Sequence, residues 1–356
     1  MIYSPNTSNM KLIIKALVVV LISSGIAVKS YSQDLHLSQY DAAPLFFNPA
    51  LSGNFDGIHR FIGNYKSQWR TYNTALLSYD RMLPANITLA GGKFGLGGIV
   101  TKDKAGETGY GYTQIKLIPS YHIPIIPNDI LYLSAGLEFS MTQNGIDKNA
   151  VQTGSSIDPT TGQSTSGYDG LNNNVWYFDM AAGINAYTLV KGQYPVNLGI
   201  TLCHLLKPGK SLVGTGTITN PRRFSVNANT VIRIDSSFSL LPSLIWLRQK
   251  PSDEINIGTF LKYNLKKQPY AGYFGCWYRV KDAIILGLAI DVPGFQPNHV
   301  LNIGFSYDVT LSSYATTAKN DKSKIGSNSF EVSIKYIIKK GLFKYAPPVK
   351  LNPVIF

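Results

Sequence analysis

The chain has 356 residues, of which 44% are hydrophobic and only 15% are charged, and its formal net charge is +13. Soluble globular domains usually carry about 25% charged residues, so this composition is poor in charge for a soluble protein. A basic balance is one mark of nucleic-acid binding, but here it accompanies 22 tyrosines and no basic helix. We therefore expect no nucleic-acid partner, and attraction to anionic lipid headgroups or lipopolysaccharide fits better.

Residues 1–32 have the layout of a secretory signal peptide. A basic start at Met10–Lys15 precedes a nearly continuous apolar run over 16–28 and small residues at Ser30 and Ser32, the order of a charged, an apolar and a cleavage region. A transmembrane anchor is the alternative, but the run is shorter than the roughly 20 residues that span a bilayer. We expect cleavage near Ser32. Nine mostly polar residues precede Met10, which makes Met10 a candidate start codon.

Residues 33–57 form a segment of a different kind. Two prolines, two asparagines and two glycines fall between Pro44 and Gly57; they remove backbone donors and favour turns, so we predict neither strand nor helix. Four large apolar side chains make the segment too apolar for a free linker, since monomers rarely expose such a patch. They are Leu45, Phe46, Phe47 and Leu51. The segment is predicted to be a plug in a barrel lumen or a periplasmic lid, with a partner-binding surface as the remaining alternative.

From residue 58 to 340, segments of alternating polarity recur with turn signals between them, and we predict about fourteen strands. In the run from Val196 to Cys203, for example, every second residue is aliphatic up to Leu202. The predicted bounds are 58–71, 74–83, 92–102, 109–122, 129–143, 174–188, 194–204, 222–234, 237–248, 254–265, 270–280, 283–292, 299–310 and 328–340.

The length of these segments indicates a membrane. Strands of soluble sandwiches cluster near 5 to 6 residues, whereas tilted strands that cross a bilayer need roughly 9 to 11. A sheet in lipid must close on itself, and bacterial single-chain barrels have even strand numbers. We therefore predict an all-β fold, a transmembrane antiparallel outer-membrane β-barrel. Its predicted inward-facing charges are Arg233, Glu331, Lys335, Glu138 and Lys262.

The loops support the same topology. The three longest, 144–173, 205–221 and 311–327, follow the fifth, seventh and thirteenth predicted strands and so share one end, as the external loops of such barrels do. Connections at the other end, such as Asp235–Ser236, are brief. The sequence predicts that the long loops are extracellular and that Trp69 lies near the outer headgroups, with burial in the lumen as its alternative.

The sequence shows no motif for catalysis, for cofactor binding or for metal binding. The five histidines have no ligand spacing, and we expect each in an aromatic girdle or a turn; they are His36, His59, His122, His204 and His299. The glycines at 91, 92, 95, 97 and 98 precede no helix, so they indicate a close-packed or bent strand rather than a phosphate loop. Cys203 and Cys276 are predicted to be free thiols on separate strands. Nothing here indicates an enzyme, a cofactor or a metal site.

The amino-acid sequence at both ends of the mature chain resembles the PorP/SprF family of type IX secretion proteins. The N-terminal signature is QDLHLSQYDAAPLFFNPALSG, followed by NYKSQWRT and LLSYDRML; near the other end IGFSYDVTLSS and SFEVSIKYII resemble the closing hairpin. The resemblance covers Gln33 to about Lys340. The residues that carry it, together with the apolar pair and the turn glycine of the segment, are Ser38, Gln39, Tyr40, Phe46, Phe47, Asn48, Pro49, Ala50, Gly53, Gln68, Trp69, Ser306, Tyr307 and Asp308.

This resemblance implies a non-enzymatic outer-membrane barrel that serves type IX secretion and, in some members, export or surface attachment of gliding adhesins and other large secreted proteins. It further implies a periplasmic ring lipoprotein with associated subunits, and cargo with a C-terminal sorting domain, as partners. The alternative is a porin or a transporter of hydrophobic compounds. One departure is the tail over 341–356, whose prolines prevent ladder pairing, so the assembly signal lies either at Phe356 or within 336–338.

Overall fold

The computed structural model describes residues 34–69, 71–84, 86–89, 91–106, 109–126, 131–147, 161, 172, 174–190, 194–212, 218–265, 269–296, 298–312 and 328–339. The predicted signal peptide over 1–32 and the tail over 341–356 lie outside the described residues. Within the described part, no helix is long and apolar enough to cross a membrane.

The described residues form three short helical turns and then one antiparallel sheet of 15 strands. The turns are η1 (Tyr40–Ala42), α2 (Pro44–Phe47) and η2 (Pro49–Leu51). The strands are β1 (His59–Gln68), β2 (Tyr72–Met82), β3 (Lys93–Ala105), β4 (Tyr110–Ile126), β5 (Leu131–Gly145), β6 (Asn174–Val190), β7 (Tyr194–Cys203), β8 (Arg223–Thr230), β9 (Ile232–Arg233), β10 (Phe238–Gln249), β11 (Ser252–Asn264), β12 (Ala271–Arg279), β13 (Ala283–Pro293), β14 (His299–Thr310) and β15 (Ser329–Ile338).

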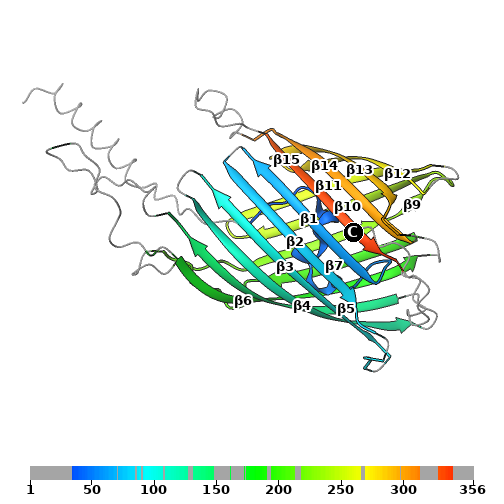
Figure 1. The fold of residues 1–356 in the computed structure, drawn as a ribbon, viewed down its shortest axis with the longest axis horizontal. Helices are drawn as coiled ribbons and strands as arrows, with labels where there is room; N and C mark the ends of the chain where they lie inside the picture. Colours follow the sequence, from blue (N-terminus) through cyan, green and yellow to red (C-terminus); the bar gives the residue numbers. More distant parts are fainter. Residues whose placement is uncertain are drawn as a thin grey trace, which may run out of the picture. The chain divides into compact units, whose positions relative to one another are not determined.

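The sheet closes into a barrel. The strands from β1 to β8 pair in sequence order, β8 pairs with β10, the strands from β10 to β15 pair in sequence order, and β15 pairs with β1 (Figure 1). β8 and β9 both pair with β10 in one register and act as a single strand that is interrupted at Val231. In this register Pro242, which cannot donate a ladder hydrogen bond, lies opposite Thr230, the residue before the interruption. The described wall is therefore a closed barrel of 14 antiparallel strands, as the sequence predicts.

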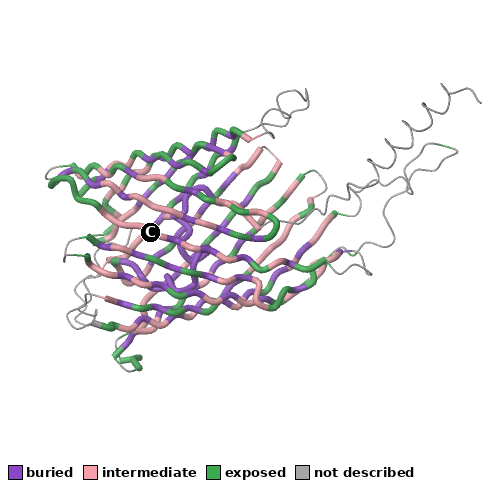
Figure 2. The backbone as a smooth tube through the Cα atoms, turned by 180° about the vertical axis from the view of Figure 1, so that it is seen from behind, coloured by how far each residue is buried: buried purple, intermediate pink, exposed green. Residues whose placement is uncertain are grey.

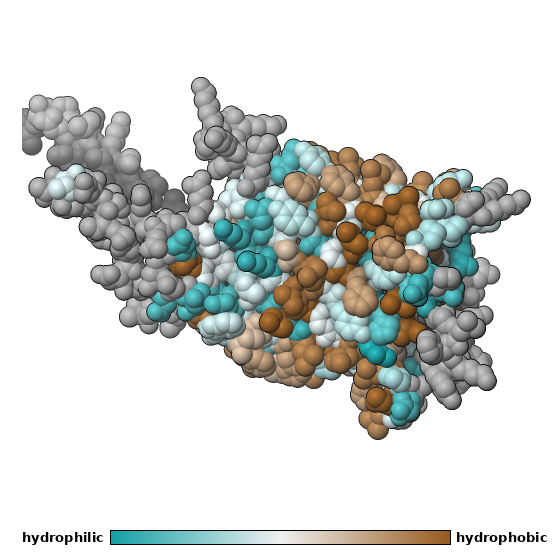
Figure 3. All heavy atoms as spheres, viewed as in Figure 1, coloured by the Kyte–Doolittle hydropathy of each residue, from teal (hydrophilic) through white to brown (hydrophobic). Residues whose placement is uncertain are grey.

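Side chains alternate between the two faces of the wall because successive residues of a strand point to opposite sides. Figure 2 shows buried and exposed residues alternating along the strands. The outward rows are apolar, as at Leu77, Ile115 and Ile184, which are more than half exposed. The inward rows are largely polar or charged, as at Lys66, Glu138 and Glu331, which are buried. Figure 3 shows apolar side chains gathered over the strands of one face, the arrangement that lipid requires.

The two ends of the barrel differ in their connections. Residues 146–173, 204–222 and 311–328 connect β5 to β6, β7 to β8 and β14 to β15, and all three lie at one end, the long-loop end. The opposite, short-turn end carries the connection between β9 and β10, and the chain enters β1 there. The predicted grouping of the long loops is thus confirmed. Trp69 follows β1 at the long-loop end, half-buried, with its ring edge against Tyr72.

Two sequence-based predictions are wrong in part. The predicted loop over 33–57 contains α2, because Pro44 occupies the first helical position, where its missing N–H is not needed. The prediction that every histidine lies in a girdle or a turn is wrong for His122. Its position in β4 places it in the inward row, where it is buried and lies within hydrogen-bond distance of Ser134 Oγ and of the Ser52 carbonyl oxygen. Cys203 and Cys276 are free, as predicted.

Candidate functional site

The N-terminal segment, residues 35–57, contacts the inward-facing side chains of the barrel through one ionic cluster. Ser38 is its centre: Lys66 Nζ donates to Ser38 Oγ (2.7 Å), and Ser38 Oγ donates to Asp308 Oδ2 (2.6 Å). Arg279 Nη2 lies 3.2 Å from the same Asp308 oxygen, and the backbone N–H of Ser38 donates to Glu331 Oε2 (2.6 Å). These four charged groups are buried, and two of each sign face one another.

Tyr40 and Gln39 extend this cluster to further strands. Tyr40 Oη donates to Glu254 Oε1 (3.0 Å) and accepts from Asn256 Nδ2 (2.5 Å). Burial, reinforced by the neighbouring Glu254 carboxylate, raises the pKa of the Tyr40 hydroxyl well above its usual value, so it remains a donor at neutral pH. Gln39 Nε2 donates to the Glu331 carbonyl oxygen (2.7 Å). Five strands, β1, β11, β12, β14 and β15, thus hold three consecutive residues of the segment.

A second contact uses an ion pair in the wall. Arg60 of β1 and Asp80 of β2 form two hydrogen bonds of 2.9 and 2.8 Å, and both side chains are almost fully buried. The backbone N–H of Gly53 donates to Asp80 Oδ2 (2.7 Å), and the Arg60 guanidinium lies over the Phe55 ring, 4.5 Å from its centre. Gly53 has φ of +73°, a conformation that glycine adopts without steric cost.

A third contact is a close approach of the segment to the backbone of the wall at three glycines, which we call the glycine track. Asn48 is fully buried; its amide donates to the Ile184 carbonyl oxygen (3.1 Å) and to Asn227 Oδ1 (3.2 Å), and its own Oδ1 caps η2 by accepting from the Ala50 N–H (2.9 Å). Three wall glycines face Asn48 and Pro49, and a Cβ on any of them would overlap the segment. They are Gly136 of β5, Gly183 of β6 and Gly199 of β7.

The apolar side chains of the segment pack on the inward rows between these polar contacts. Leu45, Phe46 and Phe47 belong to one cluster of buried side chains with wall residues of β2, β3, β4 and β10. These wall residues are Leu76, Ile99, Ile118, Ile245 and Leu247. Lys116 Nζ and the Arg223 guanidinium lie 5.2 and 5.1 Å from the centre of the Phe46 ring. Gly97 faces Leu45 and Ser52, and Gly95 faces Ser52, so the prediction of close packing in β3 is confirmed.

The motif residues named from the sequence separate into two groups. Those of the segment, Ser38 to Gly53, are buried, as are Ser306 and Asp308, and Ser38 is hydrogen-bonded to Asp308. Gln68, Trp69 and Tyr307 do not join them. Gln68 ends β1, Trp69 follows it, and Tyr307 points outward and is 39% exposed.

Several residues of the cluster were missed by the sequence reasoning, chiefly Lys66, Arg279, Asp80 and the wall glycines. A signal was present for Lys66 and Asp80, because both fall in the inward row of a predicted strand and an inward charge needs a partner. Arg279 is the last residue of β12 and lies one residue before the end of the predicted strand, 270–280, and it gave no such signal. Among the described residues, no group of three His, Cys, Asp or Glu side chains is arranged to hold a metal ion.

Fold and interior together define the class: an outer-membrane β-barrel whose inward face makes polar and ionic contacts with the N-terminal segment. Within that class, a family model described as "Type IX secretion system membrane protein PorP/SprF" matches residues 29–336. The chain belongs to this family and is an outer-membrane barrel component of the type IX secretion system. No curated protein matches the sequence.

Solved structures resemble the fold. A FadL homologue from Pseudomonas aeruginosa aligns with a TM-score of 0.50 at 12% identity, over 81% of this chain and 92% of that one. A TodX deltaS2S3 mutant, a monoaromatic hydrocarbon channel, gives 0.50 at 10% identity over 83% and 93%. At these identities the likeness concerns the fold alone, so the family match favours secretion over the porin or transporter alternative.

Proposed function

We propose that the N-terminal segment is a fixed plug and that the barrel is a docking component, which holds a partner or a secreted protein at the outer membrane rather than conducting solutes. In this role the chain supports the export, the surface attachment or both of secreted proteins such as gliding adhesins. It reaches the outer membrane after cleavage of its signal peptide, and outer-membrane lipids and lipopolysaccharide surround it.

The observation that carries this proposal is the density of contacts between the segment and the wall. A gate that opens in each transport cycle would have to break the hydrogen bonds of Ser38 to the ionic cluster, the Gly53 contact with Asp80 and the Asn48 contacts at once. Each buried hydrogen bond to a charged group contributes about 1.5–3 kcal/mol. A permanent plug keeps all of these contacts and leaves the two rims of the barrel for binding. Its partners there are the periplasmic ring lipoprotein with its associated subunits, and cargo with a C-terminal sorting domain.

A reversible tether tests whether the segment moves. Ser120 Oγ donates to the Ser52 carbonyl oxygen (2.7 Å), so cysteines at both positions are near enough for a disulfide to be attempted. The pair is introduced with Cys203→Ser and Cys276→Ser, which removes the native thiols. Export of the cognate surface protein is then measured with the tether oxidised and reduced, after thiol titration has verified the disulfide. We expect equal export in the two states.

The controls separate the plug from the role in secretion. Deletion of the gene is expected to abolish export of proteins with the sorting domain and to leave uptake of small solutes unchanged; the opposite result favours the transporter alternative. Single-cysteine variants, Ser52→Cys and Ser120→Cys, control for the substitutions. Export that returns only after reduction of the tether would show a moving gate and contradict the plug.

A further inference from the structure

A cavity of about 300 Å³ lies at the short-turn end, between the N-terminal segment and the inward faces of β9 to β15. Asp41, Phe55 and Asp56 of the segment form one side of it. Its volume is at the lower end of the range for small-ligand sites, roughly 300 to 1,000 Å³. It is therefore large enough for one group of amino-acid size.

The charges around this cavity do not balance. Four basic side chains line it against three acidic ones, and the acids are already engaged. Asp56 Oδ2 lies 2.8 Å from Lys339 Nζ, Asp41 Oδ2 lies 3.7 Å from Lys335 Nζ, and Asp291 accepts from Tyr273 Oη (2.5 Å) and Asn302 Nδ2 (2.7 Å). Lys262 Nζ reaches Asp291 only at 3.9 Å. In the described part of the chain, Arg233 has no ion pair. The cavity has an excess of positive charge that an anion can neutralise.

The register of the sheet places this excess in one row. Arg233 pairs with Ser239, and Ser239 pairs with Lys262, so the three side chains occupy neighbouring inward positions on three strands. Adjacent strands lie about 4.8 Å apart, which puts the backbones of Arg233 and Lys262 about 10 Å from each other. The guanidinium and the ammonium can therefore reach one carboxylate from both sides, with the Ser239 hydroxyl between them.

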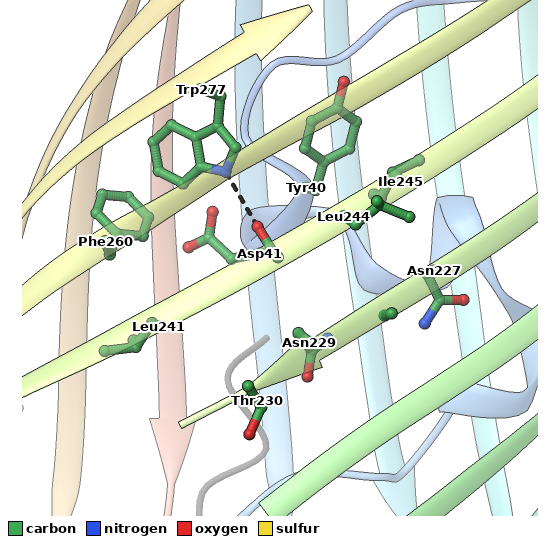
Figure 4. A pocket seen from close by; sticks show the side chains of 12 residues that line it. Tyr40, Asp41, Asn227, Asn229, Thr230, Leu241, Leu244, Ile245, Phe260 and Trp277 are labelled. Carbon is green, nitrogen blue, oxygen red and sulfur yellow. Dashed lines mark hydrogen bonds between the residues drawn. The ribbon is translucent and has the colours of Figure 1, made fainter. Parts of the chain in front are cut away.

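Deeper in the barrel the lining is apolar. Leu241 and Phe260 follow the basic row toward the barrel interior, and both also line a smaller adjoining pocket with Trp277 and Tyr40. Figure 4 shows Phe260, Trp277 and Leu241 around that pocket, next to Asp41. Trp277 Nε1 is already engaged, since it donates to Ser243 Oγ (3.0 Å). An occupant thus meets basic groups at the mouth and an apolar floor below.

We propose that this cavity binds a carboxylate carried on a compact apolar group, which enters from the short-turn end. The carboxylate lies between Arg233, Ser239 and Lys262, and the apolar group packs on Leu241 and Phe260. The same chemistry is offered by the C-terminal residue of a polypeptide and by a free amphiphilic acid. This site goes beyond the proposed role in secretion and does not depend on it.

Equilibrium dialysis of the full-length barrel in detergent, against labelled N-acetylphenylalanine and with a protein-free micelle blank, tests the site. We expect N-acetylphenylalanine to bind and its uncharged amide to compete at least tenfold less well, because a charge-assisted hydrogen bond contributes more than tenfold in affinity. Arg233→Gln and Lys262→Gln should each weaken binding about tenfold. Arg248→Gln, on β10 at the long-loop end, removes the same charge from an exposed pair and should leave binding unchanged.

Competition by octanoate identifies the source of the carboxylate. Weaker competition than by unlabelled N-acetylphenylalanine assigns a peptide terminus, and stronger competition assigns a free acid. Gel mobility before and after heating verifies that each variant is folded. The proposal is overturned if acid and amide bind equally, if neither acid binds, or if Arg233→Gln matches Arg248→Gln. Since wild-type binding must also weaken with salt, an affinity independent of ionic strength would overturn it without any variant.

Discussion

Lys66 is an ammonium group in a position that excludes water. It is 1% exposed, and its charge is balanced by Asp308, 3.6 Å away, through the shared hydroxyl of Ser38. Lys66→Met keeps most of the volume and removes the charge. We expect it to lower the free energy of unfolding by about 3–5 kcal/mol, because it leaves two buried carboxylates, Asp308 and Glu331, with Arg279 as the remaining cation of the cluster. The change in unfolding free energy is measured by urea titration of the reconstituted barrel, with gel mobility as the readout of unfolding.

The matched control for Lys66 is Arg248→Met. Arg248 and Asp253 form an ion pair of 3.7 Å with both side chains about half exposed, and such pairs contribute about 1 kcal/mol or less. Similar losses in the two variants would show that the interior cluster is no more than a solvated ion pair.

A substitution at Gly136, again compared with a matched control, tests whether the close approach at the glycine track stabilises the barrel. A methyl group there meets the backbone of Pro49 and Ala50, which cannot rotate away as a side chain can. We expect Gly136→Ala to destabilise the barrel by about 1–3 kcal/mol through overpacking, and to make the segment accessible to protease. Gly272→Ala is the control, since a Cβ at Gly272 meets nothing within 4 Å. Equal protease resistance in both variants would contradict the claim that the glycine track is needed for the segment to pack on the wall.

At the scale of the element, α2 is one helical turn that is stabilised by burial rather than by its own hydrogen bonds. Phe46 is 5% exposed and packs between the segment and the wall. Phe46→Ala is expected to lower the free energy of unfolding by about 3–5 kcal/mol. Export is expected to decrease in proportion to the loss of folded barrel and no further. Heat-modifiability and export are measured on the same cells.

Phe295→Ala controls for loss of a phenyl ring, because Phe295 is 89% exposed; its effect on stability should be within about 0.5 kcal/mol. Normal barrel stability with lost export in the double variant Phe46→Ala and Phe47→Ala would instead make the segment a partner-binding surface. If folding and export both stay normal in this double variant, the segment has no role in either.

The orientation of the strands gives a separate prediction. Because the long loops share one end, we expect an epitope tag within 144–173 to be reached by antibody on intact cells and a tag at Asp235–Ser236 to be reached only after the outer membrane is permeabilised. Labelling at Asp235–Ser236 on intact cells would invert the topology. A tag at Val280–Lys281, between β12 and β13 at the long-loop end, should behave like the first.

The strands could be predicted from the sequence and the contacts of the segment could not. Alternation is a local property, so β14 was predicted with its observed bounds, 299–310. The errors lie at the strand ends: β4 ends at Ile126, whereas the predicted strand ends at residue 122. Ser38 and Asp308, by contrast, are 270 residues apart, and no local pattern specifies which inward side chains meet. The helical turn α2 was not predicted, because Pro44 was taken to interrupt regular structure although proline can also be the first residue of a helix.

At the scale of the whole molecule, the proposed plug predicts that the segment blocks ion flow through the lumen. Deletion of residues 38–53 removes the side chains that pack on Leu76, Ile99 and Ile118 and exposes Asp80, Asp308 and Glu331 to water. We expect single barrels in planar bilayers to conduct little with the segment and to form stable open channels without it. A deletion of equal length within the long loop, residues 153–168, is the control. Equal conductance of the wild type and the 38–53 deletion would contradict a plug.

The pairing of the first residues with the last strand has a consequence for the order of assembly. Ser38 and Gln39 are held by Glu331, and the first strand closes on the same β15 along its whole length. Contacts between such distant parts of a chain form late, because the intervening loop must be closed first. We therefore expect the β1–β15 pairing and the contacts of Ser38 and Gln39 with Glu331 to form together, when β15 arrives. A nascent barrel that lacks this strand is an open sheet in which Ser38 and Gln39 have no contact with Glu331, so we expect the barrel to close only when synthesis of the chain has reached β15.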